Sequence, residues 1–310
     1  MDLSKIQRTI KGVTIPSVMV GGGVAKTTEH LDQYTQTETL AEWGSFTKEE
    51  KVGNGGRDYY AHYRGGELQF ALNSIGLTNP GIEYAKRNSR EMINRYADHG
   101  KPLILNISGE GVQDSLELLQ KAVEYRFPIV TANAACPNVE SGGSRPMPVM
   151  CFDIDAMQQF IIRADAKIGS TDNVIMLKVS TGLPLLTLKQ ICETLKGTSA
   201  FSGIITGNTV PGGFHYLEDG QTAIKTRTGI EVGGMSGPAI KPLALSQTKF
   251  AADFFGANKE VWHCGGIMNA DDCHDAFRAG ASAVQLVTGF IEAGQKPEFI
   301  RDILVDLAND

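Results

Sequence analysis

A cysteine stands between two asparagines near the middle of the sequence, in the segment Asn133-Ala134-Ala135-Cys136-Pro137-Asn138. Asparagine side chains carry amide donors and an acceptor, which suit a planar heterocycle with amide edges. A thiol beside such a ligand can act as a base when its thiolate is accessible. A lone cysteine is also often a buried, inert core residue, so this segment alone leaves both interpretations open.

Other residues that could bind a ligand also follow apolar runs. Gly21-Gly22-Gly23, with Lys26 three residues later, is either a tight turn or a close approach of the backbone to a ligand. The segment Asn73-Ser74-Ile75-Gly76-Leu77-Thr78-Asn79 is either a ligand contact or a turn with a helix N-cap. Lys178 ends an apolar run, and alternation does not decide whether it points inward or to solvent. Gly207-Asn208-Thr209 follows a further run.

Short apolar, β-branched runs alternate with helical segments along the chain, which predicts βα units. Eight strands are expected, at residues 17–20, 42–46, 102–107, 128–132, 174–179, 201–206, 260–263 and 283–287. Helices are expected at 80–96, 112–125, 153–166, 188–195, 242–255 and 270–279. Eight such units favour the α/β fold class, as a (β/α)8 TIM barrel, with a doubly wound open sheet as the alternative.

The residues that could bind or react with a ligand lie after the predicted strands. In a parallel barrel this end is the catalytic mouth. Gly265-Gly266 and Thr288-Gly289 follow the last two strands, where backbone N–H groups commonly bind phosphate. Plain tight turns would not need glycine after both strands. The pairing therefore predicts a phosphate site.

The 310 residues contain no internal repeat and no Pro/Ser-rich linker, so we expect one domain over residues 1–310. Three long connections are expected, at about 48–79, 137–152 and 209–241. Long loops in a compact domain are usually functional.

Composition argues against several classes of protein. Hydrophobic residues at 42% and charged residues at 21% are typical of a globular protein. A net charge of −6 without a basic cluster argues against a nucleic-acid partner. The sequence shows no signal peptide and no apolar stretch of about 18 residues. We therefore expect that the protein is not secreted and does not span a membrane. Five scattered cysteines without a CxxC pair predict reduced thiols in the cytoplasm and no metal site.

Together these motifs resemble the dihydroorotate dehydrogenase family, flavin-dependent (β/α)8 barrels of pyrimidine synthesis. The resemblance extends from Pro16 to about Leu307. It rests on Asn73 to Leu77, Asn133 to Asn138 in the family's Asn-x-x-Cys-Pro-Asn form, Asn208-Thr209, Gly233 to Gly237 with Ile240-Lys241-Pro242, Gly265-Gly266-Ile267, and Gly280-Ala281-Ser282 leading to Gln285.

The resemblance implies oxidation of (S)-dihydroorotate to orotate with FMN as cofactor, in the synthesis of UMP. Cys136 would be the general base, and hydride would pass from C6 to the flavin N5. The implied cofactor-binding residues are Gly22, Gly23, Asn106, Asn133, Lys178, Ser236, Gly237, Gly265, Gly266, Thr288 and Gly289. The implied substrate-binding residues are Lys26, Asn73, Ile75, Gly76, Leu77, Asn133, Asn138, Asn208 and Thr209.

Cysteine at the base position resembles the class 1 members of the family. Those members usually carry a lysine after the second strand, where this chain has Gly44, whereas Lys26 stands where class 2 members carry theirs. The resemblance also implies a homodimer. It leaves the electron acceptor open between fumarate, a quinone, and NAD through an iron-sulfur partner subunit.

Two other hypotheses stay open. A paralogous flavin oxidoreductase could act on another dihydropyrimidine, because the lysine absent at Gly44 helps to set the polarity of the site. A flavin- or phosphate-binding barrel without catalysis could serve as a sensor or assembly subunit. Cys136 argues against this last hypothesis, because a binding module needs no thiol at its mouth.

Overall fold

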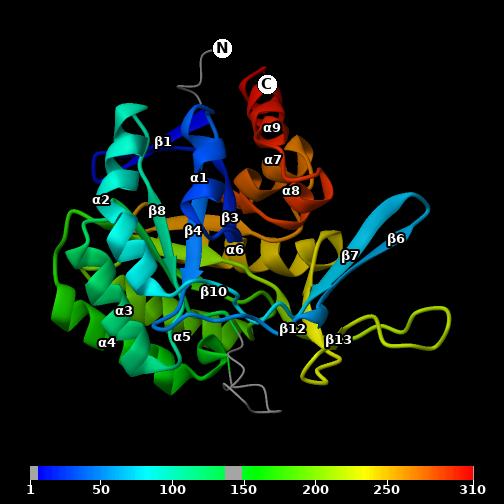
Figure 1. Ribbon diagram of the computed structural model, residues 1–310. Coiled ribbons are helices and arrows are strands. Elements are labelled where there is room, and N and C mark those ends of the chain that lie inside the picture. Colours follow the sequence, from blue (N-terminus) through cyan, green and yellow to red (C-terminus); the bar gives the residue numbers. More distant parts are fainter. Residues whose placement is uncertain (1–5, 137–148, 310) are drawn as a thin grey trace.

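Eight parallel strands form a closed barrel in the computed structural model, which describes residues 6–136 and 149–309 (Figure 1). In chain order the strands are β3 (Val18–Ala25), β4 (Ala41–Phe46), β8 (Ile104–Ile107), β9 (Ile129–Asn133), β10 (Val174–Val179), β11 (Gly203–Thr206), β15 (Glu260–Cys264) and β16 (Ala283–Leu286). Strand β16 pairs with β3 and closes the ring. The predicted TIM barrel and its eight strands are confirmed, and the open-sheet alternative is wrong.

Helices surround the barrel (Figure 1). They are α1 (Thr28–Thr35), α2 (Ile82–Asp98), α3 (Val112–Glu124), α4 (Ile154–Ile168), α5 (Leu185–Lys196), α6 (Lys241–Phe255), α7 (Ala270–Arg278), α8 (Thr288–Glu292) and α9 (Pro297–Asn309), with 3-10 turns η2 (Met150–Phe152) and η3 (Pro238–Ile240). The six predicted helices are confirmed, whereas α1, α8 and α9 were not predicted. Helix α1 begins with a capping box in which Thr27 and His30 bond reciprocally.

The barrel strands are buried on both faces. Every residue of β8, β9, β10, β11 and β16 is buried. Such strands have near-continuous apolar sequences, which is why apolar runs predicted them. Each fully buried aliphatic side chain contributes about 1.5–3 kcal/mol. Burial of a polar or charged side chain in the same layer is costly unless it has partners.

A four-stranded antiparallel sheet lies beside the barrel, at the lower right of Figure 1. Its strands, in order, are β12 (Val210–Gly213), β14 (Gly233–Ser236), β7 (Glu67–Asn73) and β6 (Tyr59–Arg64). A smaller pair joins β13 (Lys225–Thr226) to β5 (Gly56–Arg57). Both sheets unite the connections 48–79 and 209–241, which therefore contain strands and are not plain loops. Their half-exposed residues lack the apolar runs that revealed the barrel. Of the expected loop 137–152, residues 137–148 lie outside the described residues.

The hairpin of β1 (Gln7–Ile10) and β2 (Val13–Pro16) covers the amino-terminal end of the barrel. This end is opposite the carboxyl ends of the strands. Arg8 of this hairpin forms an ion pair with Glu260, the first residue of β15. Within residues 6–136 and 149–309, no helix is long and apolar enough to cross a membrane.

Candidate active site

Lys178 points into the mouth of the barrel, which settles the orientation that the sequence left open. Its side chain is only 3% exposed, and its Nζ donates to Gln285 Oε1 over 2.8 Å and lies 3.9 Å from Glu42 Oε2. Burial by itself lowers the pKa of Lys178, but the neighbouring Cys264 and the Glu42 carboxylate outweigh it, so the pKa is raised. Lys178 is therefore a fixed cation at neutral pH.

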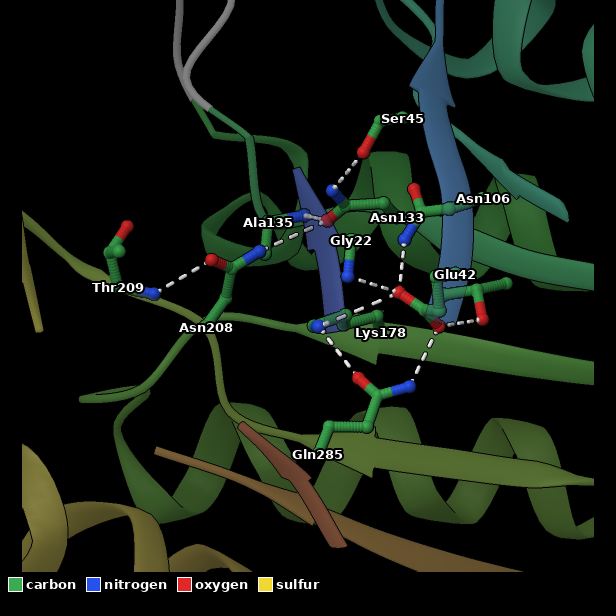
Figure 2. A network of polar contacts seen from close by, with 11 residues as sticks. Gly22, Glu42, Ser45, Asn106, Asn133, Ala135, Lys178, Asn208, Thr209 and Gln285 are labelled. Atoms are coloured by element: carbon green, nitrogen blue, oxygen red, sulfur yellow. Dashed lines mark hydrogen bonds and ion pairs between the residues drawn. The ribbon is translucent and has the colours of Figure 1, made fainter. Parts of the chain in front are cut away.

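Glu42 is a fully buried carboxylate at the centre of the mouth (Figure 2). Its Oε2 accepts from the Gly22 N–H and from Asn106 Nδ2, each at 2.7 Å. Its Oε1 accepts from Gln285 Nε2 at 2.7 Å and from the Thr131 hydroxyl. The sequence analysis did not select Glu42. The available signal was an acidic residue inside an otherwise buried strand, since such a charge needs partners.

Asn133 and Asn208 form a chain of hydrogen bonds across the mouth (Figure 2). Asn133 Nδ2 donates to Ser45 Oγ at 3.2 Å, and Asn133 Oδ1 accepts from the Ala135 N–H at 3.1 Å. Asn208 Nδ2 donates to Asn133 Oδ1 at 3.3 Å, while Asn208 Oδ1 accepts from the Thr209 N–H at 2.8 Å. These bonds fix the orientation of both amides before any ligand arrives.

Cys136 lies half-buried at the end of the first described stretch. Burial raises the pKa of its thiol to about 11, although the positive charges of Lys178, Lys26 and Lys51 all act to lower it. Cys136 is therefore a thiol at neutral pH in the ligand-free protein, with three cations near enough to favour its thiolate. Asn138, the second asparagine of the motif, lies outside the described residues.

Lys26 follows β3 and directly precedes Thr27, the N-cap of α1. It is half-buried, and burial lowers its pKa, while nearby Cys136 and Asp58 partly offset that effect. The Lys26 Nζ makes no hydrogen bond or ion pair with another described residue. Its charge is thus available at the mouth beside Cys136.

The glycine triplet lies within the end of β3 and not in a loop after it. A Cβ on Gly22 would stand 2.5 Å from Asn106 Nδ2 and 2.9 Å from Glu42 Oε2. Gly23 has a φ of +108° and open space where a Cβ would be. The strand therefore needs glycine at position 22 for the close packing of the polar network.

Segment 73–77, predicted to contact substrate, lies at the end of β7. Asn73 Nδ2 donates to the Gly234 carbonyl over 3.4 Å, and the Ile75 carbonyl accepts a backbone hydrogen bond. Gly76 and Leu77 have φ angles of +77° and +55°, so the chain turns sharply there. These four residues remain predicted substrate contacts.

Asn79, at the end of the same motif, has a structural role. Its Oδ1 accepts from the N–H groups of Thr47 and Gly81, and Gly81 is the N-cap of α2. For Asn79 the turn interpretation of the motif is therefore the right one.

The predicted phosphate residues meet at one place. Thr288 Oγ1 donates to Ser236 Oγ at 3.0 Å, and a Cβ on Gly237 would lie 3.6 Å from Thr288 Cγ2. The N–H groups of Gly265, Gly266, Thr288 and Gly289 donate to no other described residue. The structure thus gathers two hydroxyls and four unengaged N–H groups.

The turn at Gly265 is fixed by His263. His263 Nε2 contacts the Gly265 carbonyl at 2.9 Å, and burial lowers the pKa of His263 to about 4, so the ring is neutral. A Cβ on Gly266 would stand 2.4 Å from the Lys241 Cβ. A side chain at residue 266 would therefore displace the chain at Lys241.

A model of the family described as dihydroorotate dehydrogenase matches residues 5–309, nearly the entire chain. The chain belongs to the dihydroorotate dehydrogenase family. This family consists of oxidoreductases, and the predicted resemblance to its class 1 members is confirmed.

Individual relatives of the dihydroorotate dehydrogenase family agree with this assignment. The dihydroorotate dehydrogenase B (NAD(+)) catalytic subunit of Carboxydothermus hydrogenoformans is 30% identical over 235 residues, covering 75% of this chain and 70% of that protein. The protein of the same name from Thermoplasma volcanium is 27% identical over 297 residues, or 94% of this chain and 89% of the relative. The ligand-free DHODH crystal structure from Eimeria tenella has a TM-score of 0.79 at 19% identity, covering 100% of this chain and 89% of that one. At this identity the structure supports the fold alone.

Dihydroorotate dehydrogenases are flavoproteins, and the mouth of this barrel fits a flavin. Asn106 Oδ1 is buried without a partner among the described residues, and in Figure 2 it points away from Glu42. Lys178 supplies a cation, and the hydroxyls of Ser236 and Thr288 lie beside unengaged N–H groups. These groups can hold the polar edge and the phosphate of such a cofactor.

Proposed function

We propose that this protein oxidises (S)-dihydroorotate to orotate in pyrimidine synthesis, with FMN as its bound cofactor. The observation that carries the proposal is the gathering of Cys136 with Lys26, Lys51 and Lys178 at the mouth. A thiol surrounded by cations suits removal of a proton from an anionic substrate. Membership of the dihydroorotate dehydrogenase family supports the same activity.

Each residue has a separate task in this reaction. The thiolate of Cys136 accepts the proton from C5 of the substrate, and the cations stabilise that thiolate and the substrate carboxylate. The amides of Asn133 and Asn208, oriented by their mutual hydrogen bond, position the pyrimidine ring. When bound, FMN supplies the acceptor for the hydride that leaves C6.

The cofactor-binding and substrate-binding residues predicted from the sequence are part of this proposal. The FMN phosphate binds at Ser236-Gly237, Gly265-Gly266 and Thr288-Gly289, and Lys178 and Asn106 face the polar edge of the ring. This arrangement is supported by the N–H groups and by Asn106 Oδ1, which have no partner among residues 6–136 and 149–309.

NAD(+) is the proposed final oxidant, reached through a second, electron-transferring subunit. The names of the curated relatives, which are NAD(+)-dependent catalytic subunits, support this choice over fumarate or a quinone. Within the described residues, no group of three or more His, Cys, Asp or Glu side chains could hold a metal. A homodimer of single-domain chains in the cytoplasm completes the proposal.

A second candidate substrate is an uncharged dihydropyrimidine. The observation that favours it is Gly44, because this position carries no lysine to meet a carboxylate. Anaerobic stopped-flow mixing with dihydroorotate and with dihydrouracil separates the two functions. We expect dihydroorotate to bleach the flavin at least 100-fold faster. Faster bleaching by dihydrouracil would assign the chain to the second function.

A further inference from the structure

Among residues 6–136 and 149–309, Glu42 is the one buried carboxylate, and it has no task in the proposed reaction. We propose that Glu42 is a positioning residue that orients Asn106 and Lys178 toward the flavin and lowers the flavin's midpoint potential. The proposal rests on the proposed function only in taking FMN as the cofactor of the mouth.

The hydrogen-bond partners of Glu42 match those of a carboxylate. Two donors reach each oxygen, namely Gly22 N–H and Asn106 Nδ2 at Oε2, and Gln285 Nε2 and the Thr131 hydroxyl at Oε1. An ionised carboxylate offers about four acceptor sites and no donor, which matches this set. A proton on Oε2 would meet two N–H donors, from Gly22 and Asn106, instead of an acceptor.

The orientation of Gln285 is fixed by charge. Its Oε1 accepts from the Lys178 ammonium at 2.8 Å, so its amide nitrogen must face the other way, toward Glu42 at 2.7 Å. Gln285 therefore connects the carboxylate to the cation, in addition to their direct separation of 3.9 Å. Glu42 thus holds Lys178 both through space and through this amide.

Asn106 is oriented in the same manner. Its Nδ2 donates to Glu42 Oε2, which leaves its Oδ1 as a buried acceptor with no partner in the described part of the chain. An unpaired buried acceptor destabilises the protein unless a ligand donor reaches it. By holding the nitrogen, Glu42 directs the oxygen of Asn106 to the ligand.

The negative charge of Glu42 also acts on the flavin in the direction opposite to the positive charge of Lys178. Reduction of a flavin adds negative charge to its polar edge, which a nearby lysine stabilises and a nearby carboxylate destabilises. Both side chains are almost fully buried, at 3% and 0% exposure, so solvent screens them little. Glu42 therefore makes reduction of the flavin harder and leaves the reduced flavin a better electron donor.

The test is the midpoint potential of bound FMN in Glu42→Gln, measured by reductive dye titration without substrate. We expect the equilibrium between oxidised and reduced flavin to move at least tenfold toward reduced, a rise of about 30 mV for a two-electron couple. The dissociation constant for oxidised FMN, read from flavin fluorescence, should rise several-fold because Gln has one acceptor oxygen, which cannot serve both Asn106 at Oε2 and Gln285 at Oε1. Glu42→Asp should keep the equilibrium between oxidised and reduced flavin within threefold of the wild-type value.

Two variants serve as controls. Glu260→Gln removes a carboxylate of another barrel strand, at the end far from the mouth, and should leave the potential unchanged. Thr131→Val removes one hydrogen-bond donor from Glu42 and leaves its negative charge in place. The midpoint potential of the flavin should therefore equal that of wild type or lie below it. Thr131→Val also decides the matter if Glu42→Gln does not fold, because a raised potential in Thr131→Val would overturn the proposal.

A midpoint potential of Glu42→Gln that is unchanged or lower contradicts the proposed role of the charge. An equal change of the midpoint potential in Glu260→Gln would show that the loss of a carboxylate elsewhere in the barrel has the same effect, which contradicts a specific role of Glu42. These outcomes are independent of the proposed reaction, because no dihydroorotate is present. A wild-type protein that takes up no FMN would instead overturn the proposed function.

Discussion

A Cβ on Gly44 would lie 2.4 Å from the carbonyl oxygen of Asn106, and the φ of Gly44 is +120°. No side chain fits at residue 44 on this backbone, so the lysine that class 1 members usually carry there has no room. Among the residues that the structure describes, Lys26 and Lys51 are the cations near Cys136 besides the buried Lys178. Under the proposed function, an anionic substrate therefore meets Lys26, after β3, and Lys51, after β4.

Lys26→Ala should weaken orotate binding 10-fold or more. A cation at about 4 Å from an anion in a partly desolvated site contributes a few kcal/mol, at roughly 1.4 kcal/mol per decade of affinity. Uracil, which is uncharged, should lose much less. Titration of the flavin spectrum with both ligands measures this, and equal orotate affinity in the two proteins would make Lys26 a surface residue.

Gly44→Lys should not restore the binding lost in Lys26→Ala. The positive φ alone costs a residue with a side chain about 1–3 kcal/mol, and the contact with the Asn106 carbonyl adds to it. We expect a lower midpoint of urea unfolding for Gly44→Lys in either background. A stable double variant with recovered orotate affinity would show that the strand adapts and that this account of position 44 is wrong.

Cys136→Ala should keep FMN and orotate binding while slowing flavin reduction by about 10²- to 10⁴-fold, the usual contribution of a general base. Because the alanine removes only the thiol, binding and chemistry should separate. Stopped-flow reduction at pH 8 provides the rate. An unchanged rate would leave Cys136 as an inert core cysteine.

The rate of flavin reduction should rise as the pH approaches the pKa that Cys136 has in the ligand-free protein. Its pKa is raised to about 11, so the thiolate fraction grows about tenfold per pH unit between pH 7 and pH 10. Lys51→Met removes a cation that lowers this pKa, so the profile should move to higher pH. A profile that is flat from pH 7 to 10, or that moves to lower pH in Lys51→Met, would argue for another base.

The sequence predicted the barrel and much of the mouth because both depend on local pattern. Apolar runs marked all eight strands. Asn133 and Asn208, which follow predicted strands, are hydrogen-bonded to each other in the structure, whereas the direction of Lys178 was left open by the sequence. The carboxyl ends of parallel strands must converge, so these positions follow from strand order alone.

Glu42 could not be found in this way, because its partners are distant in sequence. Gln285 lies 243 residues away, and only the closure of the barrel between β16 and β3 brings it near. The strands β6, β7, β12 and β14 were missed because half-exposed residues give no apolar run.

The most direct test of the account is anaerobic titration of the purified protein with (S)-dihydroorotate, followed at the visible absorption band of the flavin. We expect that the protein purifies with FMN, that one equivalent of dihydroorotate bleaches it, and that one equivalent of orotate is recovered. A flavin that stays oxidised under excess dihydroorotate, with orotate absent from the products, would contradict it.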